Sequence, residues 1–186
     1  MFIIGESGCG KDFLAEELCK PPSLYHKVIL TTTRPIRENE TQDENYHYVE
    51  DAEFHKMVEM GKIGGVKYFN NWGYGIQYKD LHSHKINICV ISPKAMIAFI
   101  KDLFEAQINF TYKIAKIRAS DKIRLIRQLN REDNPNVEEI VRRYGTDKSD
   151  FLEESSWGLV EELVDNSKSD EGKSALRVLR SILMKL

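Results

Sequence analysis

Gly5-Glu6-Ser7-Gly8-Cys9-Gly10-Lys11 is the stretch of this sequence that decides the fold. It has the spacing GxxxxGK, which is typical of a loop that wraps a nucleotide's phosphates between a strand and a helix. Glycines let successive backbone N–H groups point at phosphate oxygens, where a side chain would block the approach. The lysine reaches the terminal phosphates, and the positive end of the following helix stabilises them further. The stretch therefore predicts ATP binding.

The residues around this loop predict a βαβ unit. Met1–Ile4 is a short apolar run typical of a buried strand, and Asp12–Lys20 places its apolar side chains on one helical face. Pro21 and Pro22 end that helix. Val28–Thr33 is β-branched and is expected to form the next strand. A strand, a loop, a helix and a strand in this order favour a parallel sheet.

Residues 34–85 have a different composition from the rest of the chain. They are polar and rich in aromatic residues and glycine, so we interpret them as an inserted lobe with short strands and a helix near Asp51–Met60. The alternation of strands and helices resumes afterwards. The elements expected there are strands at Ile86–Ile91, Tyr112–Ile117 and 159–164, and helices at Pro93–Phe104, Asp121–Leu129, from Val137 onward, and 174–186.

Composition limits the classes of function. The 186 residues are 41% hydrophobic and 30% charged with a net charge of -2, which suits one compact domain and offers no polybasic surface for nucleic acid. The apolar runs are as short as Ile88–Ile91, so we expect no membrane partner and no signal peptide. Cys9, Cys19 and Cys89 lack paired spacing, which favours reduced thiols in a cytoplasmic protein. We expect a small-molecule partner and a monomer or homodimer.

Asp12 departs from the usual loop pattern. Ser or Thr normally follows the lysine, and its hydroxyl ligates Mg²⁺. A carboxylate can hold the same ion because hard cations prefer oxygen ligands. It can equally cap the new helix by accepting hydrogen bonds from its first N–H groups, and the sequence leaves both roles open. Cys9 is interpreted as a small loop residue and not as a redox switch.

A second polar cluster follows the expected strand at Val28–Thr33. Arg34 and Arg37 stand three residues apart, so two guanidinium groups can grip an acceptor phosphate through bidentate hydrogen bonds. Tyr46 can donate its hydroxyl to the same anion. Such a cluster alone is more often a solvated turn, but a phosphate loop upstream favours anion binding.

At this point the chain resembles the guanylate kinase family. Gly5–Lys11 is similar to the family's GPSGxGKS-type loop, Thr32–Arg37 with Glu40 to its T-T-R-x-x-R-x-x-E motif, and Tyr46-His47-Tyr48 to its Tyr-x-Phe. The order and spacing also match. Further similarities lie at Gly73-Tyr74-Gly75, at Arg127-Gln128-Leu129 with Arg131, at Arg143, and at Val164-Asp165-Asn166.

The resemblance implies an α/β fold of the P-loop kinase type. A three-layer parallel sheet flanked by helices would be formed by residues 1–33 and 86–186, with a lid at about 131–143 and a nucleotide-monophosphate-binding lobe at 34–85. It implies ATP and Mg²⁺ as cofactors and transfer of the γ-phosphate to a nucleoside monophosphate. The site residues carried over are Lys11, Arg34, Arg131 and Arg143 for catalysis, Gly5–Asp12 and Asn166 for ATP, Arg34, Arg37, Tyr46 and Tyr74 for the acceptor, and Asp12 for Mg²⁺.

Three of these assignments keep an alternative. Only one of Arg142 and Arg143 can point at the site, and Arg143 is preferred. Tyr74 either stacks on an acceptor base or belongs to the core of the small lobe. Asn166 either contacts adenine or ends a strand in a turn.

Several residues of the acceptor site differ from the family pattern. The sequence has Leu30 where the family has a serine that touches the acceptor phosphate, Gly65 in place of the glutamate that reads guanine, Ile76 in place of a serine near the base, and Val90 and Ser92 in place of an acidic pair. A buried polar reader gives strong discrimination between analogues, so its loss relaxes the base choice. GMP and dGMP remain the first acceptors expected. The alternatives are a kinase for another phosphorylated acceptor, such as ribose 1,5-bisphosphate, and a catalytically inactive interaction module.

Overall fold

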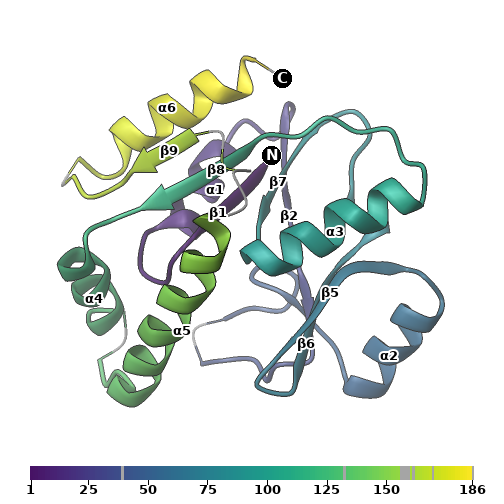
Figure 1. Ribbon diagram of the computed structural model, residues 1–186, viewed down its shortest axis with the longest axis horizontal. Coiled ribbons are helices and arrows are strands. Elements are labelled where there is room, and N and C mark those ends of the chain that lie inside the picture. The colour runs from purple at the N-terminus through teal and green to yellow at the C-terminus, as the bar shows by residue number, and fades with distance from the viewer. Residues whose placement is uncertain (39, 132, 156–159, 161, 169, 186) are drawn as a thin grey trace.

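The computed structural model describes residues 1–38, 40–131, 133–155, 160, 162–168 and 170–185, with the side chains of 152–155 left aside. A five-stranded parallel sheet of order β2-β7-β1-β8-β9 forms its centre, with helices on both faces (Figure 1). The elements of this part are β1 (Phe2–Gly5), α1 (Lys11–Leu18), β2 (Tyr25–Val28), β7 (Ile86–Val90), α3 (Pro93–Glu105), β8 (Ile114–Arg118), α4 (Asp121–Leu129), α5 (Val137–Ser155), β9 (Glu162–Asp165) and α6 (Lys173–Leu183).

The central strand β1 is buried on both of its faces. Ile3 belongs to the hydrophobic cluster that contains the apolar faces of α1 and α6, whereas Phe2 and Ile4 belong to the cluster formed with α3. Successive side chains of a strand point to opposite faces, so a continuous apolar run is what a strand between two helical layers requires. The expected α/β fold with a parallel sheet flanked by helices is confirmed.

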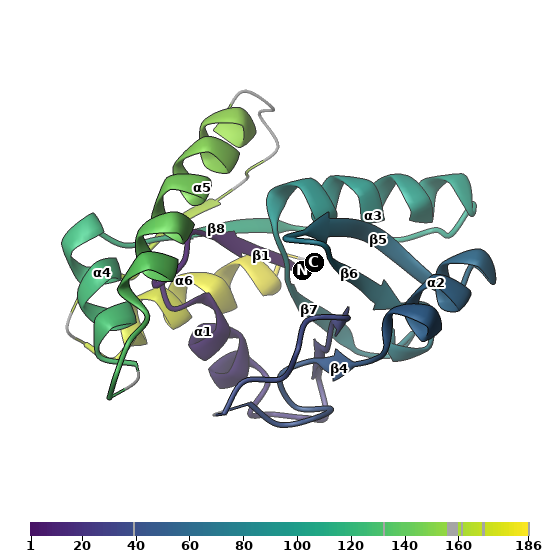
Figure 2. The same ribbon diagram turned by 90° about the horizontal axis from the view of Figure 1, so that it is seen from below.

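A second sheet of four strands lies beside α3. Its order is β4-β3-β6-β5, and α3 packs along β5. Figure 2 shows this sheet and α2 on one side of the molecule and α4 with α5 on the other. Its elements are β3 (Thr31–Thr32), β4 (His47–Tyr48), α2 (Asp51–Glu59), β5 (Ile63–Phe69), β6 (Trp72–Gln77) and the short 3₁₀ helix η1 (Tyr78–Asp80).

The expectation of one strand at Val28–Thr33 is wrong. The strand β2 ends at Val28 in the first sheet, and Thr31–Thr32 belongs to the second sheet. The new partners explain the change, because Thr31 Oγ1 accepts a hydrogen bond from Gln77 Nε2 at 2.8 Å and Leu30 O accepts one from the N–H of His47 at 2.9 Å. A β-branched run indicates a strand but not which neighbours it pairs with.

Two other expectations fall partly outside the described residues. The strand expected at 159–164 includes residues 159 and 161, and the observed strand β9 covers 162–165. Residue 186 of the last expected helix is also outside the described part. Within that part, no helix combines the length and the apolar character needed to cross a membrane.

The side chain of Phe54 packs α2 against the small sheet. Its side chain is fully buried, and a Cβ added at Gly73 would lie only 2.6 Å from its ring, so α2 packs directly on the β6 backbone. We expect Phe54→Ala to lower the free energy of unfolding by about 3–5 kcal/mol in urea denaturation. Phe104→Ala is the matched control, because Phe104 is 79% exposed and should change stability by no more than about 0.5 kcal/mol. Equal losses in both variants would contradict this packing.

Candidate functional site

The glycine-rich loop leaves β1 at the centre of the parallel sheet, where ligands of such sheets bind. Gly8 and Gly10 have φ of 79° and 88°, in the left-handed region that favours glycine. A Cβ at Gly5 would lie 2.5 Å from Ile117 O of β8. The helix α1 begins at Lys11 with Gly10 as its N-cap and no capping side chain, which leaves its first N–H groups available to an anion.

Side chains from the far end of the chain hold the carbonyl side of this loop. Asn166 Nδ2 donates to Cys9 O at 2.9 Å, and Arg127 Nη1 donates to the same oxygen at 3.2 Å. Arg127 Nη2 also donates to Asn166 O at 2.9 Å. Asn166 is 4% exposed, so the structure places this predicted ATP residue behind the loop with its amide directed at the loop backbone.

Lys11 and Asp12 begin α1 side by side. Lys11 Nζ lies 3.9 Å from Asp12 Oδ2, and the Asp12 side chain is 70% exposed. Burial favours the neutral form of Lys11, but the charges of Asp12 and Asp147 are among those that raise its pKa overall, so it stays a cation. Burial raises the pKa of the Cys9 thiol, which keeps it protonated at neutral pH and suits a structural role.

Asp12 could bind a magnesium ion as its one protein ligand. The N-cap of α1 is Gly10, so the carboxylate of Asp12 is not engaged in capping and faces solvent at the start of the helix. Among the residues that the structure describes, no three His, Cys, Asp or Glu side chains gather as a metal site. Mg²⁺ commonly takes one or two carboxylates and receives its other ligands from phosphates and water, which matches this donor set.

Arg34 is buried and already paired. Its Nη2 donates to both oxygens of Glu40 at 2.9 and 2.8 Å, and its Nη1 donates to Pro35 O at 2.9 Å. Tyr48 OH donates to Glu40 Oε2 at 2.8 Å. Burial opposes the charged form of Glu40, but the hydrogen bonds from Arg34 and Tyr48 lower its pKa. Arg34 therefore organises this part of the site through Glu40.

Arg37 lies where the charges of the other predicted arginines act on it. Its Nη1 lies 3.8 Å from Glu40 Oε1, and its side chain is 34% exposed. Burial lowers the pKa of Arg37, and so do the like charges of Arg143, Arg34 and Arg131. Two of these residues follow Thr32, one follows α4 and one lies on α5, so the fold gathers positive charge from distant segments at one place. A gathering of guanidinium groups is suited to binding an anion.

Two tyrosines line the same region. The rings of Tyr46 and Tyr74 meet edge to face with centroids 6.2 Å apart, and Arg34 Cζ lies 5.4 Å from the Tyr46 ring centroid. Burial, Asp12 and Tyr74 raise the pKa of Tyr46 to about 12, so its hydroxyl keeps its proton and can donate it to a phosphate. Tyr46 also interacts electrostatically with Lys11, so this tyrosine links the arginine cluster to the start of α1.

Arg142 and Arg143 share one carboxylate on α5 and then diverge. Glu139 Oε1 accepts from Arg143 Nε at 2.7 Å and Glu139 Oε2 accepts from Arg142 Nε at 2.6 Å. These arginines lower the pKa of Glu139 to about 2, Arg142 contributing most. Arg142 Cζ lies 4.9 Å from the ring centroid of Phe69 on β5, whereas the charge of Arg143 acts on Arg37.

The positions that differ from the guanine-reading pattern have structural roles. Gly65 has φ 64°, its N–H donates to Asp102 Oδ2 at 2.7 Å, and a Cβ there would lie 2.8 Å from Phe99 Cβ on α3. Ile76 is 1% exposed and packs in the cluster beneath α3. Ser92 caps α3 by accepting from the N–H of Ala95 at 3.4 Å. A glutamate at position 65 would point into α3 and away from an acceptor.

Arg124 and Asp147 belong to the site but were not identified from the sequence. Arg124 is fully buried beside the phosphate loop, and Asp147 Oδ2 accepts a hydrogen bond from the N–H of Ser7 at 2.6 Å. Neither residue has a motif around it. A charged residue within the amphipathic helix α4 was the available signal, but on a helix such a residue is usually solvated.

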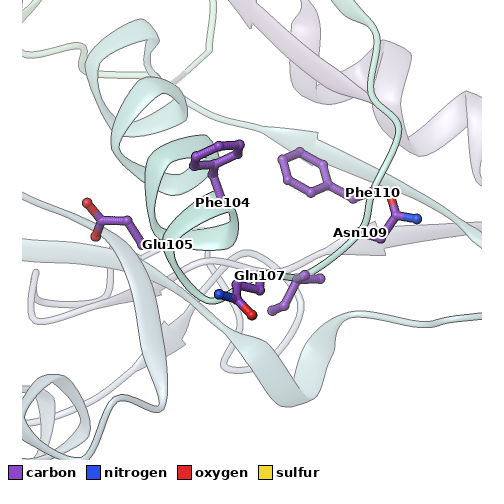
Figure 3. A pocket seen from close by; sticks show the side chains of 6 residues that line it. Phe104, Glu105, Gln107, Asn109 and Phe110 are labelled. Atoms are coloured by element: carbon purple, nitrogen blue, oxygen red, sulfur yellow. The ribbon is translucent and has the colours of Figure 1, made fainter.

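A shallow hollow of about 580 Å³ lies elsewhere, at the carboxyl end of α3 (Figure 3). It lies just before the segment that enters β8 at its amino end, whereas the phosphate loop is at the carboxyl ends of the strands. The hollow is unsuited to binding a phosphate because none of its lining residues is basic. They are Phe104, Glu105, Gln107, Ile108, Asn109 and Phe110.

Comparisons with known proteins agree with this geometry over the first half of the chain. The family model for guanylate kinase matches residues 1–91. The chain is 41% identical over 59 residues to a guanylate kinase of Sulfurimonas denitrificans and 42% identical over 64 residues to one of Novosphingobium aromaticivorans. These matches cover 32% and 34% of this chain, and the chain spans only 29% of the length of each relative.

The fold extends the similarity over the whole chain. The crystal structure of guanylate kinase from Anaplasma phagocytophilum superposes with a TM-score of 0.66 and covers 100% of this chain and 85% of that protein. The sequence identity of that superposition is 20%, so it speaks for the fold alone.

The buried pair of Arg34 and Glu40 gives a pH-dependent prediction. Both side chains are 6% exposed, so Glu40→Gln leaves a buried guanidinium without its carboxylate and should cost roughly 3 kcal/mol of stability at pH 7. The pKa of Glu40 is lower in the folded state than the ordinary value of about 4.3, so this stabilisation is present above about pH 4.3 and is lost as the pH falls through the folded-state value.

Denaturant titrations of wild type and Glu40→Gln at pH 7 and at decreasing pH measure this difference. The gap between the two proteins should narrow below about pH 4.3. Glu38→Gln is the matched control, because Glu38 is exposed and carries the same charge. A gap that stays constant with pH would rule out the ion pair as its source.

Proposed function

On the premise that residues 1–91 belong to the guanylate kinase family, we propose that this protein moves the γ-phosphate of ATP to a nucleoside monophosphate. The proposal is carried by one observation: Tyr46 interacts electrostatically with Lys11, and its ring centroid lies 5.4 Å from Cζ of Arg34, one of a group of arginines drawn from three segments. Phosphoryl transfer requires two anions to be held in line and the spreading negative charge to be neutralised. These arginines are Arg34, Arg37, Arg131 and Arg143.

Each group has a distinct role in the proposal. Lys11, the N–H groups at the start of α1 and the loop N–H groups other than those of Ser7 and Cys9 bind the β- and γ-phosphates of ATP. Arg37 and Tyr46 hold the acceptor phosphate, which is itself the nucleophile. Arg34, fixed on Glu40, positions them and contributes charge. We propose residues 34–85 as the acceptor lobe and about 131–143 as the lid, whose Arg131 and Arg143 stabilise the transferring group. Such arginines can contribute roughly 10³ to 10⁵ in rate.

Asp12 would hold Mg²⁺ in this arrangement. When bound, the ion neutralises phosphate charge and helps to orient the nucleotide. Asn166 acts from behind the loop by holding Cys9 O, which keeps the neighbouring N–H groups directed at the nucleotide. Tyr74 contributes an aromatic face beside Tyr46, on which an acceptor base can stack.

We further propose that the choice of base is relaxed. GMP and dGMP are the first acceptors to test, but no carboxylate is directed at the acceptor from position 65, and Ile76 is part of the core. The burial of Ile76 also favours a second candidate, a phosphorylated sugar that fills less space than a nucleotide. ADP release measured across purine and pyrimidine monophosphates and ribose bisphosphates separates the two. Activity on the sugar alone would reject the nucleotide acceptor.

Lys11 provides the first test of catalysis. We expect Lys11→Ala to lower turnover by about 10²-fold or more, because a preorganised positive charge at the terminal phosphates is lost. A coupled ADP-release assay measures it, and Lys62→Ala, which removes an exposed lysine, serves as the control. Unchanged turnover in Lys11→Ala, or wild type that neither binds ATP nor releases ADP, would favour an interaction module without catalysis.

Arg37 provides the test of the acceptor site. Arg37→Ala should lower kcat/KM for the acceptor by roughly 10- to 100-fold, because a hydrogen bond to a charged group contributes about 1.5–3 kcal/mol. The KM for ATP should change much less. Arg177→Ala is the matched control, since Arg177 is an exposed arginine on α6. An effect confined to the KM for ATP would contradict the assignment of Arg37 to the acceptor site.

A further inference from the structure

The phosphate loop is tied to two helices by one buried guanidinium. Arg124 on α4 is fully buried, and its Nε donates to Ser7 O at 3.0 Å. Its Nη1 lies 2.9 Å from Glu6 Oε2, and its Nη2 donates to Asp147 Oδ2 at 3.2 Å. One side chain thus joins the loop, α4 and α5, which lie next to each other in Figure 1.

Asp147 completes this connection from the side of α5. Its Oδ2 accepts from the N–H of Ser7 at 2.6 Å as well as from Arg124, and its side chain is 18% exposed. Tyr144 adds contacts between α5 and α4, because its ring centroid lies 5.2 Å from Arg124 Cζ and its hydroxyl donates to Asp121 Oδ2 at 2.5 Å. Two side chains of α5 therefore grip the loop and α4 at one place.

The same helical face carries Arg143. Asp147 follows it by four residues, so the two side chains lie on the same face about one turn apart. Burial lowers the pKa of Arg37, and the like charges of Arg143 and Arg34 lower it further, so α5 carries its cation close to two others. The contacts of Asp147 fix α5 there, because they are largely buried and a buried ion pair is costly to break.

We propose that Asp147 is a positioning residue that, together with Arg124, latches α5 onto the phosphate loop and so holds Arg143 over the transferring phosphate. This inference rests on the proposed function for the role of Arg143, but the latch itself is independent of activity. Arginine placement matters because a displacement of about 1 Å can cost roughly 10²-fold in rate.

The first experiment measures the latch without any substrate. Amide hydrogen exchange followed by NMR should show the N–H of Ser7 and the amides of α5 exchanging about tenfold faster or more in Asp147→Ala. Asp150→Asn is the matched control, since it removes the same charge from the same helix at a residue paired with Lys94 at 3.1 Å. Unchanged protection of Ser7 in Asp147→Ala would overturn the proposal.

The second experiment measures the consequence for the reaction in a double-mutant cycle. Asp147→Ala should lower kcat by roughly 10- to 100-fold with little change in the KM for ATP, and should cause no further loss in an Arg143→Ala background. Losses that multiply in the double variant would overturn the proposal. So would tighter ATP binding with faster turnover, which would make Asp147 a competitor of the nucleotide.

Two further measurements keep the outcomes separate. Asp147→Asn retains the shape of the side chain and removes only its charge. If Asp147→Ala unfolds, both experiments are repeated with Asp147→Asn. If wild type shows no phosphoryl transfer to any acceptor, the proposed function fails alone. Faster exchange at Ser7 would then still support the latch, and unchanged exchange would still reject it.

Discussion

The structure depends on how the carbonyl groups of the phosphate loop are held. Arg124 takes the carbonyl of Ser7, and Asn166 with Arg127 takes the carbonyl of Cys9. The loop thus leads into α1 with its backbone fixed, and the first N–H groups of α1 have no capping side chain, which makes this helix start suited to an anion. Glycine permits this because a side chain at position 5 would collide with β8 and one at position 8 with the backbone of α4.

The electrostatics of the site follow from the same arrangement. The chain as a whole carries a net charge of -2, yet the charges of Arg34, Arg131 and Arg143 all act on Arg37. Glu40 and Glu139 each bind guanidinium groups, and this orders the cluster while leaving it open to an anion. The opposing carboxylates of Glu6, Asp121 and Asp147 surround Arg124 on the other side of the loop. The fold thus separates the ion cluster around Arg124 from the arginine cluster around Glu40 and Glu139.

The proposed acceptor region keeps one part of the guanylate kinase pattern and lacks another. The arginines and tyrosines proposed to bind the acceptor phosphate lie together, whereas the positions expected to read a base are part of the packing between the small sheet and α3. Gly65 needs a left-handed backbone at a bulge of β5, and Ile76 fills the cluster beneath α3. The family model for guanylate kinase matches residues 1–91, while the similarity in fold covers the whole chain.

The sequence alone determined the features that depend on local pattern. The spacing of Gly5–Lys11 identified the phosphate loop, and apolar periodicity located the main helices and the parallel sheet. Only the tertiary structure decided that Val28–Thr33 divides between two sheets, that position 65 points into α3, and that Asp147 binds a loop amide 140 residues away. Periodicity reports which face of a segment is buried, but a strand's partner, a bulge's direction and a carboxylate's donor depend on distances that exist only after the chain has packed.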